Sequence, residues 1–135
     1  MQDKQSNSSY SVIRGLHMQA GEHSQAKLVR LFECAVIDVA VDVRPGSETY
    51  GQSVAVELSA NNKRQLFIPR GFLHGFSVIS EKATFFYKCD NGYNKASEDG
   101  VHPLDHELTI DWQIPEDKMI ISEKDLEAQS FETFR

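Results

Sequence analysis

The sequence predicts an all-β fold, a jelly-roll barrel or sandwich with a short C-terminal helix, and three observations support this. Apolar residues alternate with polar ones over short runs, polar turns separate these runs, and no stretch shows a long helical period. A chain of 135 residues with 40% apolar residues is enough for one packed domain without a second core. Six or more short strands at this spacing are typical of sheets that close around a cavity.

The amino-terminal residues 1–11 are polar and rich in Ser and Asn, so we expect a flexible arm, followed by one domain over residues 12–135. The clearest strand covers 36–43, where every second residue is apolar, as in a strand with one face in the core. The other predicted strands are short and rich in β-branched or aromatic residues: 28–33, 54–58, 66–68, 75–79 and 83–89. The tail 122–134 predicts one short helix capped by Ser122.

Charge and composition exclude several classes of function. The net charge of −6 disfavours general attraction to nucleic acid phosphates or to anionic lipid, so an anionic ligand must be bound by local cations. No apolar run reaches the length of a membrane span, and the first residues have no hydrophobic signal core. We therefore expect a cytoplasmic protein that binds neither nucleic acid nor membranes. Cys34 and Cys89 lack the spacing of a disulfide framework or a zinc site, so we expect free, partly buried thiols.

Two of the five histidines lie in segments that suggest a site. His17 follows an Arg-Gly pair within 14–19, and His74 lies in 69–76, whose Pro, Gly and His spacing is similar to the later half of the cupin pattern. A metal-binding cupin normally supplies more histidines and an acid nearby, but Gln19 stands where the second ligand would be, so we expect no metal. The other three histidines, His23, His102 and His106, lie in polar stretches and are expected to be solvated.

Three further candidates have ordinary structural interpretations when each is taken alone. Tyr87 is on a predicted strand and fits a packed core tyrosine, and Lys27 fits a surface lysine. Asp125 fits the start of the C-terminal helix. The order of motifs along the chain weighs more than any of these residues separately.

These ordered motifs together resemble the dTDP-4-dehydrorhamnose 3,5-epimerase family, whose fold is a cupin-type jelly-roll dimer. The resemblance covers nearly the whole chain from Val12 to about Leu126. The matching segments are 14–19, 25–30, 38–44, 58–66, 68–76, 86–88, 110–112 and 121–125. Only thirteen residues precede Arg14, fewer than is usual in the family, so we expect its usual amino-terminal segment to be missing.

The resemblance implies an epimerase that acts on a nucleotide-linked 4-keto-6-deoxyhexose without a cofactor, for the biosynthesis of deoxysugars and surface polysaccharides such as O-antigen. It gives His17 the role of base, Asp125 that of the carboxylate that orients His17, and Tyr87 that of the acid on the opposite face. Lys27 would stabilise the enolate oxygen. The residues that the resemblance places around the substrate are Arg14, on the phosphates, and Gln19, His74 and Tyr93, which line the pocket.

Two other functions stay open at this point. The first is a sugar-nucleotide-binding or partner module that keeps the barrel but has no turnover, and the second is a metal-dependent cupin enzyme. The nucleotide (dTDP, GDP or CDP) and the epimerised carbon (C3, C5 or both) are also open, and we expect a homodimer.

Overall fold

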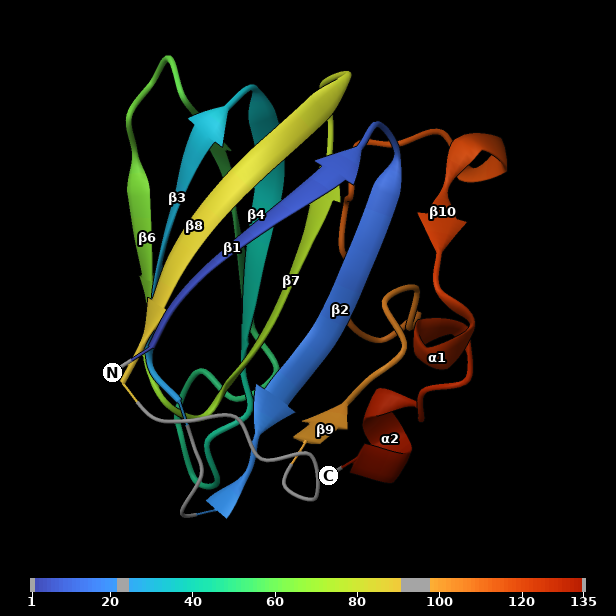
Figure 1. Ribbon diagram of the computed structural model, residues 1–135. Helices are drawn as coiled ribbons and strands as arrows, with labels where there is room; N and C mark the ends of the chain where they lie inside the picture. The colour runs from blue at the N-terminus through green and yellow to red at the C-terminus, as the bar shows by residue number, and fades with distance from the viewer. Residues whose placement is uncertain (1, 22–24, 91–97, 135) are drawn as a thin grey trace.

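The computed structural model describes residues 2–21, 25–90 and 98–134, which form short strands and very short helices (Figure 1). The elements are β1 (Gln2–Ser9), β2 (Val12–Gln19), β3 (Lys27–Glu33), β4 (Ala35–Asp42), β5 (Ser53–Ser59), β6 (Gln65–Ile68), β7 (Phe72–Val78), β8 (Lys82–Cys89), β9 (Glu98–Gly100), the 3₁₀ helix η3 (Glu116–Lys118), β10 (Ile120–Ile121), α1 (Glu123–Leu126) and α2 (Phe131–Phe134). The predicted all-β class is confirmed. None of the helices in this part of the chain is long and apolar enough to cross a membrane.

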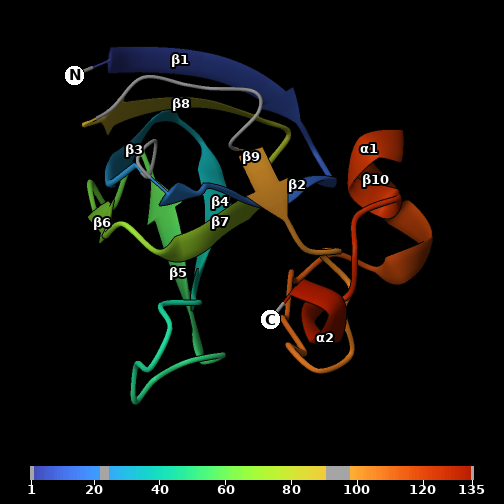
Figure 2. The same ribbon diagram turned by 90° about the horizontal axis from the view of Figure 1, so that it is seen from below.

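Two sheets face one another across the interior. Sheet A has the strand order β1-β8-β3-β6, and sheet B has the order β10-β2-β7-β4-β5, with β9 also paired to β2. All pairings are antiparallel except that of β10 with β2. Seen from below, β1 and β8 form one layer, and β2, β7 and β4 form the next (Figure 2).

Strand β4 differs from the prediction, because both of its faces are buried rather than one. Ile37, Val39 and Val41 belong to an outer core, and Val36 and Ala40 belong to an inner core. The inner core lies between the sheets, with members such as Val29 of β3 and Phe76 of β7. The alternation therefore marked which residues share a face, but it did not show that a further layer covers the second face.

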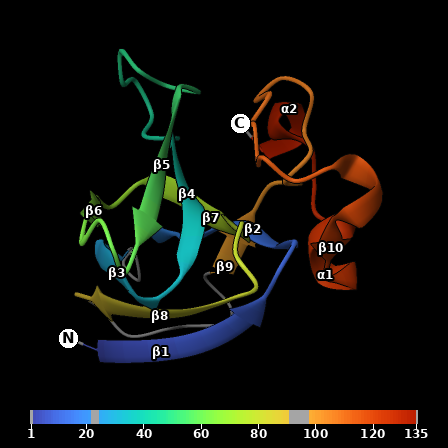
Figure 3. The same cartoon turned by 90° about the horizontal axis from the view of Figure 1, so that it is seen from above.

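That further layer comes from the C-terminal segment 101–134. Its helix α2 lies on the side of sheet B away from β1 and β8, and β10 and α1 lie at the β2 edge of the sheet (Figures 2 and 3). Val101, Leu108, Trp112 and Phe131 contribute to the outer core. Trp112 is 1% exposed, and its Nε1–H donates to the carbonyl of Pro103 at 2.8 Å. The predicted helix in this tail is present as two short ones, α1 and α2, and Ser122 is the N-cap of α1 as expected.

The amino terminus also departs from the prediction. Residues 2–9 form strand β1, paired along its whole length with β8, rather than a flexible arm. Ser and Asn have low strand propensity, so pairing with the edge of β8 outweighs the local preference. Strand β2, which carries the Arg-Gly-Leu-His motif, was not among the predicted strands, because its glycine and charged residues hide the alternation.

The turn after β4 is held by a buried carboxylate. Asp42 accepts hydrogen bonds from Arg44 Nε at 3.0 Å and Nη2 at 2.9 Å, and from the hydroxyl groups of Ser47 and Thr49. The hydrogen bonds from Arg44 are the main cause that holds the pKa of Asp42 well below its ordinary value of 3.8, although burial opposes them. Cys34 and Cys89 are both free thiols as predicted, but only Cys89 is buried and Cys34 is exposed.

Candidate active site

His17 and Asp125, which are 108 residues apart in the sequence, form a close pair. His17 Nε2 lies 2.6 Å from Asp125 Oδ1, with the histidine side chain 36% exposed and the aspartate side chain 4% exposed. A carboxylate beside one ring nitrogen keeps the proton on that nitrogen, so Nε2–H donates to Asp125. The other nitrogen, Nδ1, then keeps its lone pair for a ligand.

A β-bulge in β2 directs His17 toward this position. Arg14 lies opposite Phe76 of β7 and His17 lies opposite His74, so β2 holds one extra residue between these two pairs. Gly15, within the bulge, has φ +129, and a Cβ there would lie 2.6 Å from the Cα of Gly75. Its N–H donates to Asp125 Oδ2 at 3.2 Å. The glycine of the Arg-Gly-Leu-His motif therefore both permits the bulge and binds the partner of His17.

Asp125 is positioned by the start of α1. The backbone N–H of Asp125 donates to the Ser122 hydroxyl at 3.2 Å, which caps the helix. Burial raises the pKa of Asp125, but the hydrogen bond and charge of His17, with the Gly15 N–H, lower it more, so the net pKa lies below 3.8. The carboxylate is ionised at neutral pH and can balance positive charge on His17.

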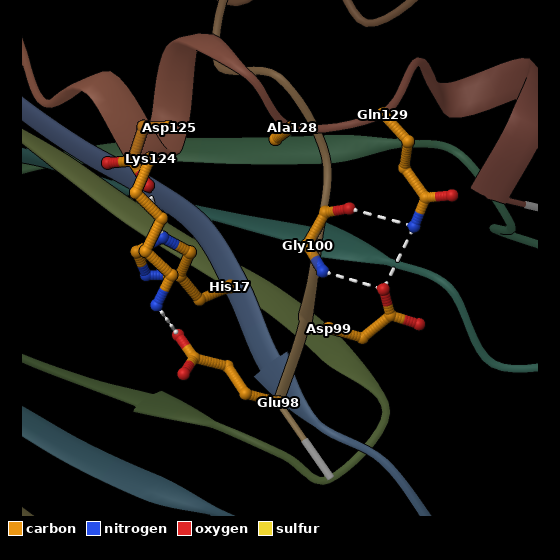
Figure 4. A pocket seen from close by; sticks show the side chains of 8 residues that line it. All are labelled: His17, Glu98, Asp99, Gly100, Lys124, Asp125, Ala128 and Gln129. Carbon is orange, nitrogen blue, oxygen red and sulfur yellow. Dashed lines mark hydrogen bonds and ion pairs between the residues drawn. The ribbon is translucent and has the colours of Figure 1, made fainter. Parts of the chain in front are cut away.

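A pocket of about 350 Å³ opens beside this pair (Figure 4). The Lys124 ammonium donates to Glu98 Oε1 at 2.7 Å on one side, and the Gln129 amide donates to Asp99 and to the carbonyl of Gly100 on the other. These polar groups come from β9 and from the C-terminal segment. The pocket therefore joins sheet B to the C-terminal layer at the position of His17.

A second histidine–aspartate pair lies next to the first. His74 Nε2 is 2.6 Å from Oδ1 of Asp38 on β4, and the histidine side chain is 11% exposed. Because His74 lies directly opposite His17 on the neighbouring antiparallel strand, both side chains face the same side of sheet B. The two pairs form a continuous polar row across β4, β7, β2 and α1.

The structure brings only some of the other predicted site residues to the same face as His17. Arg14 is exposed and faces the same side as Phe76 of the inner core, and Lys27 begins β3, two residues before Val29 on the same face. Gln19 is buried at the end of β2, opposite Glu98. Arg14, His17 and His74 thus lie on the inner face of sheet B, and Lys27 on that of sheet A. Tyr93 and the side chain of Tyr87 lie outside the described residues, although the backbone of Tyr87 pairs with Val29.

Sequence reasoning missed four charged residues at the site: Asp38, Glu98, Asp99 and Lys124. Asp38 was noted only as part of an alternating strand, and an acid within a strand that is otherwise apolar was the signal available. Glu98 and Lys124 gave no local signal, because their pairing spans 26 residues. Among the described residues, no three His, Cys, Asp or Glu side chains gather as metal ligands would.

Known proteins of one family are similar to this chain. The family model for dTDP-4-dehydrorhamnose 3,5-epimerase matches residues 1–133. The dTDP-4-dehydrorhamnose 3,5-epimerase of Shigella flexneri is 47% identical over 131 residues, which cover 97% of this chain and 71% of that protein. The enzyme of the same name from Escherichia coli K12 is 51% identical over 126 residues, covering 93% of this chain and 67% of that protein.

Two solved structures are similar over nearly the whole chain. The dTDP-4-dehydrorhamnose 3,5-epimerase from Elizabethkingia anophelis has a TM-score of 0.97 at 58% identity and covers 98% of this chain and 73% of its own. A dTDP-6-deoxy-D-glucose-3,5-epimerase from Legionella pneumophila, solved in complex with dTDP-4-keto-L-rhamnose, has a TM-score of 0.95 at 47% identity and covers 100% and 71%. The cupin-type jelly-roll prediction is confirmed, and the chain belongs to the dTDP-4-dehydrorhamnose 3,5-epimerase family.

Proposed function

We propose that this protein epimerises a dTDP-linked 4-keto-6-deoxyhexose at C3 and C5 by proton abstraction and reprotonation, in deoxysugar biosynthesis for surface polysaccharides such as O-antigen. The observation that carries the proposal is the 2.6 Å pair between His17 and a buried, ionised Asp125 beside a pocket. Membership of an epimerase family supports the same reaction.

The 4-ketone of such a sugar makes the chemistry possible without a cofactor, because it acidifies the hydrogens on the two flanking carbons. His17 Nδ1 takes the proton as the C–H bond breaks, and the electron pair forms an enolate whose charge rests on the ketone oxygen. Reprotonation of the carbon from the opposite face restores the C=O bond with inverted configuration. Asp125 stabilises the imidazolium that forms, and positioned acid and base groups of this kind each supply about 10²–10⁴-fold in rate.

The other predicted residues have proposed roles around this step. Lys27 stabilises the charge on the enolate oxygen, and Tyr87 donates its hydroxyl proton to the carbon from the opposite face. Arg14, which is exposed, binds the phosphates. Gln19, His74 and Tyr93 complete the walls of the pocket.

The names of the similar proteins guide our choice of the nucleotide and of the reacting carbons. The Legionella structure holds a dTDP sugar, and most of the similar proteins carry the name 3,5-epimerase, whereas one from Streptomyces niveus is named a 3-epimerase. We therefore favour dTDP over GDP or CDP, and both carbons over one. The homodimer and the cytoplasmic location stay predictions.

Proton NMR in D₂O tests the proposal directly. The native protein is mixed with a dTDP-linked 4-keto-6-deoxyhexose, and the C3 and C5 hydrogens are followed as they exchange with solvent; GDP and CDP analogues test the nucleotide. His17→Ala should slow exchange at both carbons by at least about 10²-fold. His106→Ala is the matched control, because His106 is exposed and is not among the residues that line the pocket.

Native protein that binds the sugar nucleotide without exchanging either hydrogen would contradict the proposal and favour a binding module. Normal exchange in a folded His17→Ala variant would leave the epimerase reaction in place but remove His17 from it.

A further inference from the structure

Asp38 is a buried carboxylate with few polar neighbours. It is 0% exposed at the centre of β4, and its neighbours across the strands are Phe76 of β7 and Val56 of β5. Val36 and Ala40, which face the same side, belong to the inner core. Oδ1 bonds to His74, but within the described part of the chain Oδ2 has no hydrogen-bond partner. A buried acceptor without a partner is destabilising.

Asp42, four residues along the same strand and on the same face, shows how this fold satisfies a structural carboxylate. Both of its oxygens accept hydrogen bonds, from Arg44, Ser47 and Thr49. Among the residues that the structure describes, Asp38 has a single partner, and that partner is a histidine at the proposed site. Its burial is therefore better explained by an effect on His74 than by stability.

The bond to Asp38 fixes both the ring and the tautomer of His74. With Nε2–H donated to the carboxylate, the lone pair of Nδ1 has no hydrogen-bond partner among the described residues. Directly opposite residues of an antiparallel pair have Cβ atoms about 5 Å apart, so a ligand that touches His17 is within reach of His74.

We infer that Asp38 is a positioning residue, which holds His74 in the Nε2–H tautomer so that Nδ1 accepts a hydrogen bond from a hydroxyl group of the bound sugar. This inference rests on the proposed function for the identity of the ligand, and on the geometry of the free protein for the tautomer. Asp38 itself touches no substrate, since it lies behind His74 and is fully buried.

The test combines ring ¹⁵N NMR of the free protein at pH 8 with steady-state kinetics. Native His74 should carry its proton on Nε2 alone. Asp38→Asn offers an amide that can also donate to Nε2, so the Nδ1–H tautomer should become populated. Because a neutral hydrogen bond contributes about 0.5–1.5 kcal/mol, KM should rise about 2- to 10-fold while kcat changes less than about threefold. Asp42→Asn, on the same strand and equally buried, should leave the tautomer, KM and kcat unchanged.

A proton on Nδ1 of the native ring, alone or together with one on Nε2, would overturn the inference, and this measurement does not require the variant to fold. An unchanged tautomer and KM in folded Asp38→Asn would also overturn it. If the native protein shows the expected tautomer and its loss in Asp38→Asn, but no sugar hydrogen exchanges, the proposed function fails and the role of Asp38 in positioning His74 stands.

Discussion

Replacing Asp125 by Asn removes the charge behind His17 while keeping the size of the side chain. Asp125 uses both oxygens, Oδ1 for His17 Nε2–H and Oδ2 for the Gly15 N–H. An amide has a single acceptor oxygen, so one of these two donors must lose its partner. Either His17 loses its orientation, or the bulge that directs it loses its support.

The expected loss follows from these contacts. A hydrogen bond to a charged group contributes about 1.5–3 kcal/mol. The interaction of Asp125 with His17 becomes stronger when His17 takes up the proton and becomes an imidazolium. Since about 1.4 kcal/mol corresponds to a factor of ten, the exchange rate at saturating sugar should fall about 10- to 150-fold. This is less than the effect of His17→Ala, because the base is still present.

The rate of deuterium exchange at C3 and C5, measured by proton NMR, is the assay. Asp117→Asn is the control for the chemical change, because Asp117 is exposed on η3. Ser122→Ala is the comparison for the helix, since it removes the cap of α1 but leaves both oxygens of Asp125. It should cost about 1 kcal/mol of stability and slow exchange less than Asp125→Asn does.

An Asp125→Asn variant that exchanges within twofold of native, while His17→Ala does not exchange, would refute this reasoning. Asp125 would then have only a structural role, as the link between α1 and the Gly15 N–H, and its 2.6 Å contact with His17 would not contribute to the rate.

Two further predictions concern the backbone and the acid stability. Gly15→Ala should lower the free energy of unfolding by more than about 2 kcal/mol and abolish exchange, because the new Cβ would lie 2.6 Å from the Gly75 Cα. Gly46 also has a positive φ but has open space around it, so Gly46→Ala should cost only about 1 kcal/mol in urea unfolding. Equal losses in the two variants would contradict the argument. Asp42→Asn should lower stability by about 3 kcal/mol at pH 7. Because the pKa of Asp42 is lowered in the folded state, the extra stability of the native protein over Asp42→Asn is present above the ordinary pKa of 3.8 and shrinks as pH falls below it. Urea unfolding at several pH values measures this, and a stability difference that stays constant from pH 7 to pH 2 would contradict the prediction.

Short strands rich in β-branched or aromatic residues could be predicted from the sequence, because these residues favour an extended backbone. The segments 28–33 and 54–58 are examples, and both lie within observed strands. Strand β1 could not be predicted in this way, since its polar residues are ordered by pairing with β8, more than seventy residues later. The second buried face of β4 depends on a layer that the C-terminal segment supplies.

Contacts between distant segments also limited the prediction of the site. His17 and Asp125 were predicted from a resemblance between ordered motifs, and no local pattern links residues 108 positions apart. The bulge at Gly15 is visible only when β2 is aligned with β7, because it is a mismatch between two strands. The acid in the middle of an apolar strand, Asp38, could have been recognised as unusual, but its partner His74 is on another strand.

The C-terminal layer connects the stability of the fold to the chemistry of the site. Asp125 reaches His17 only because the segment around it is docked on sheet B, where Trp112 and Phe131 are buried in the outer core. The Ser77 hydroxyl of β7 donates to the carbonyl of Trp112 at 2.6 Å, so this layer is also bonded to the strand that carries His74. Both histidines therefore receive their carboxylates from neighbouring elements, His74 from within sheet B and His17 from the layer that covers it.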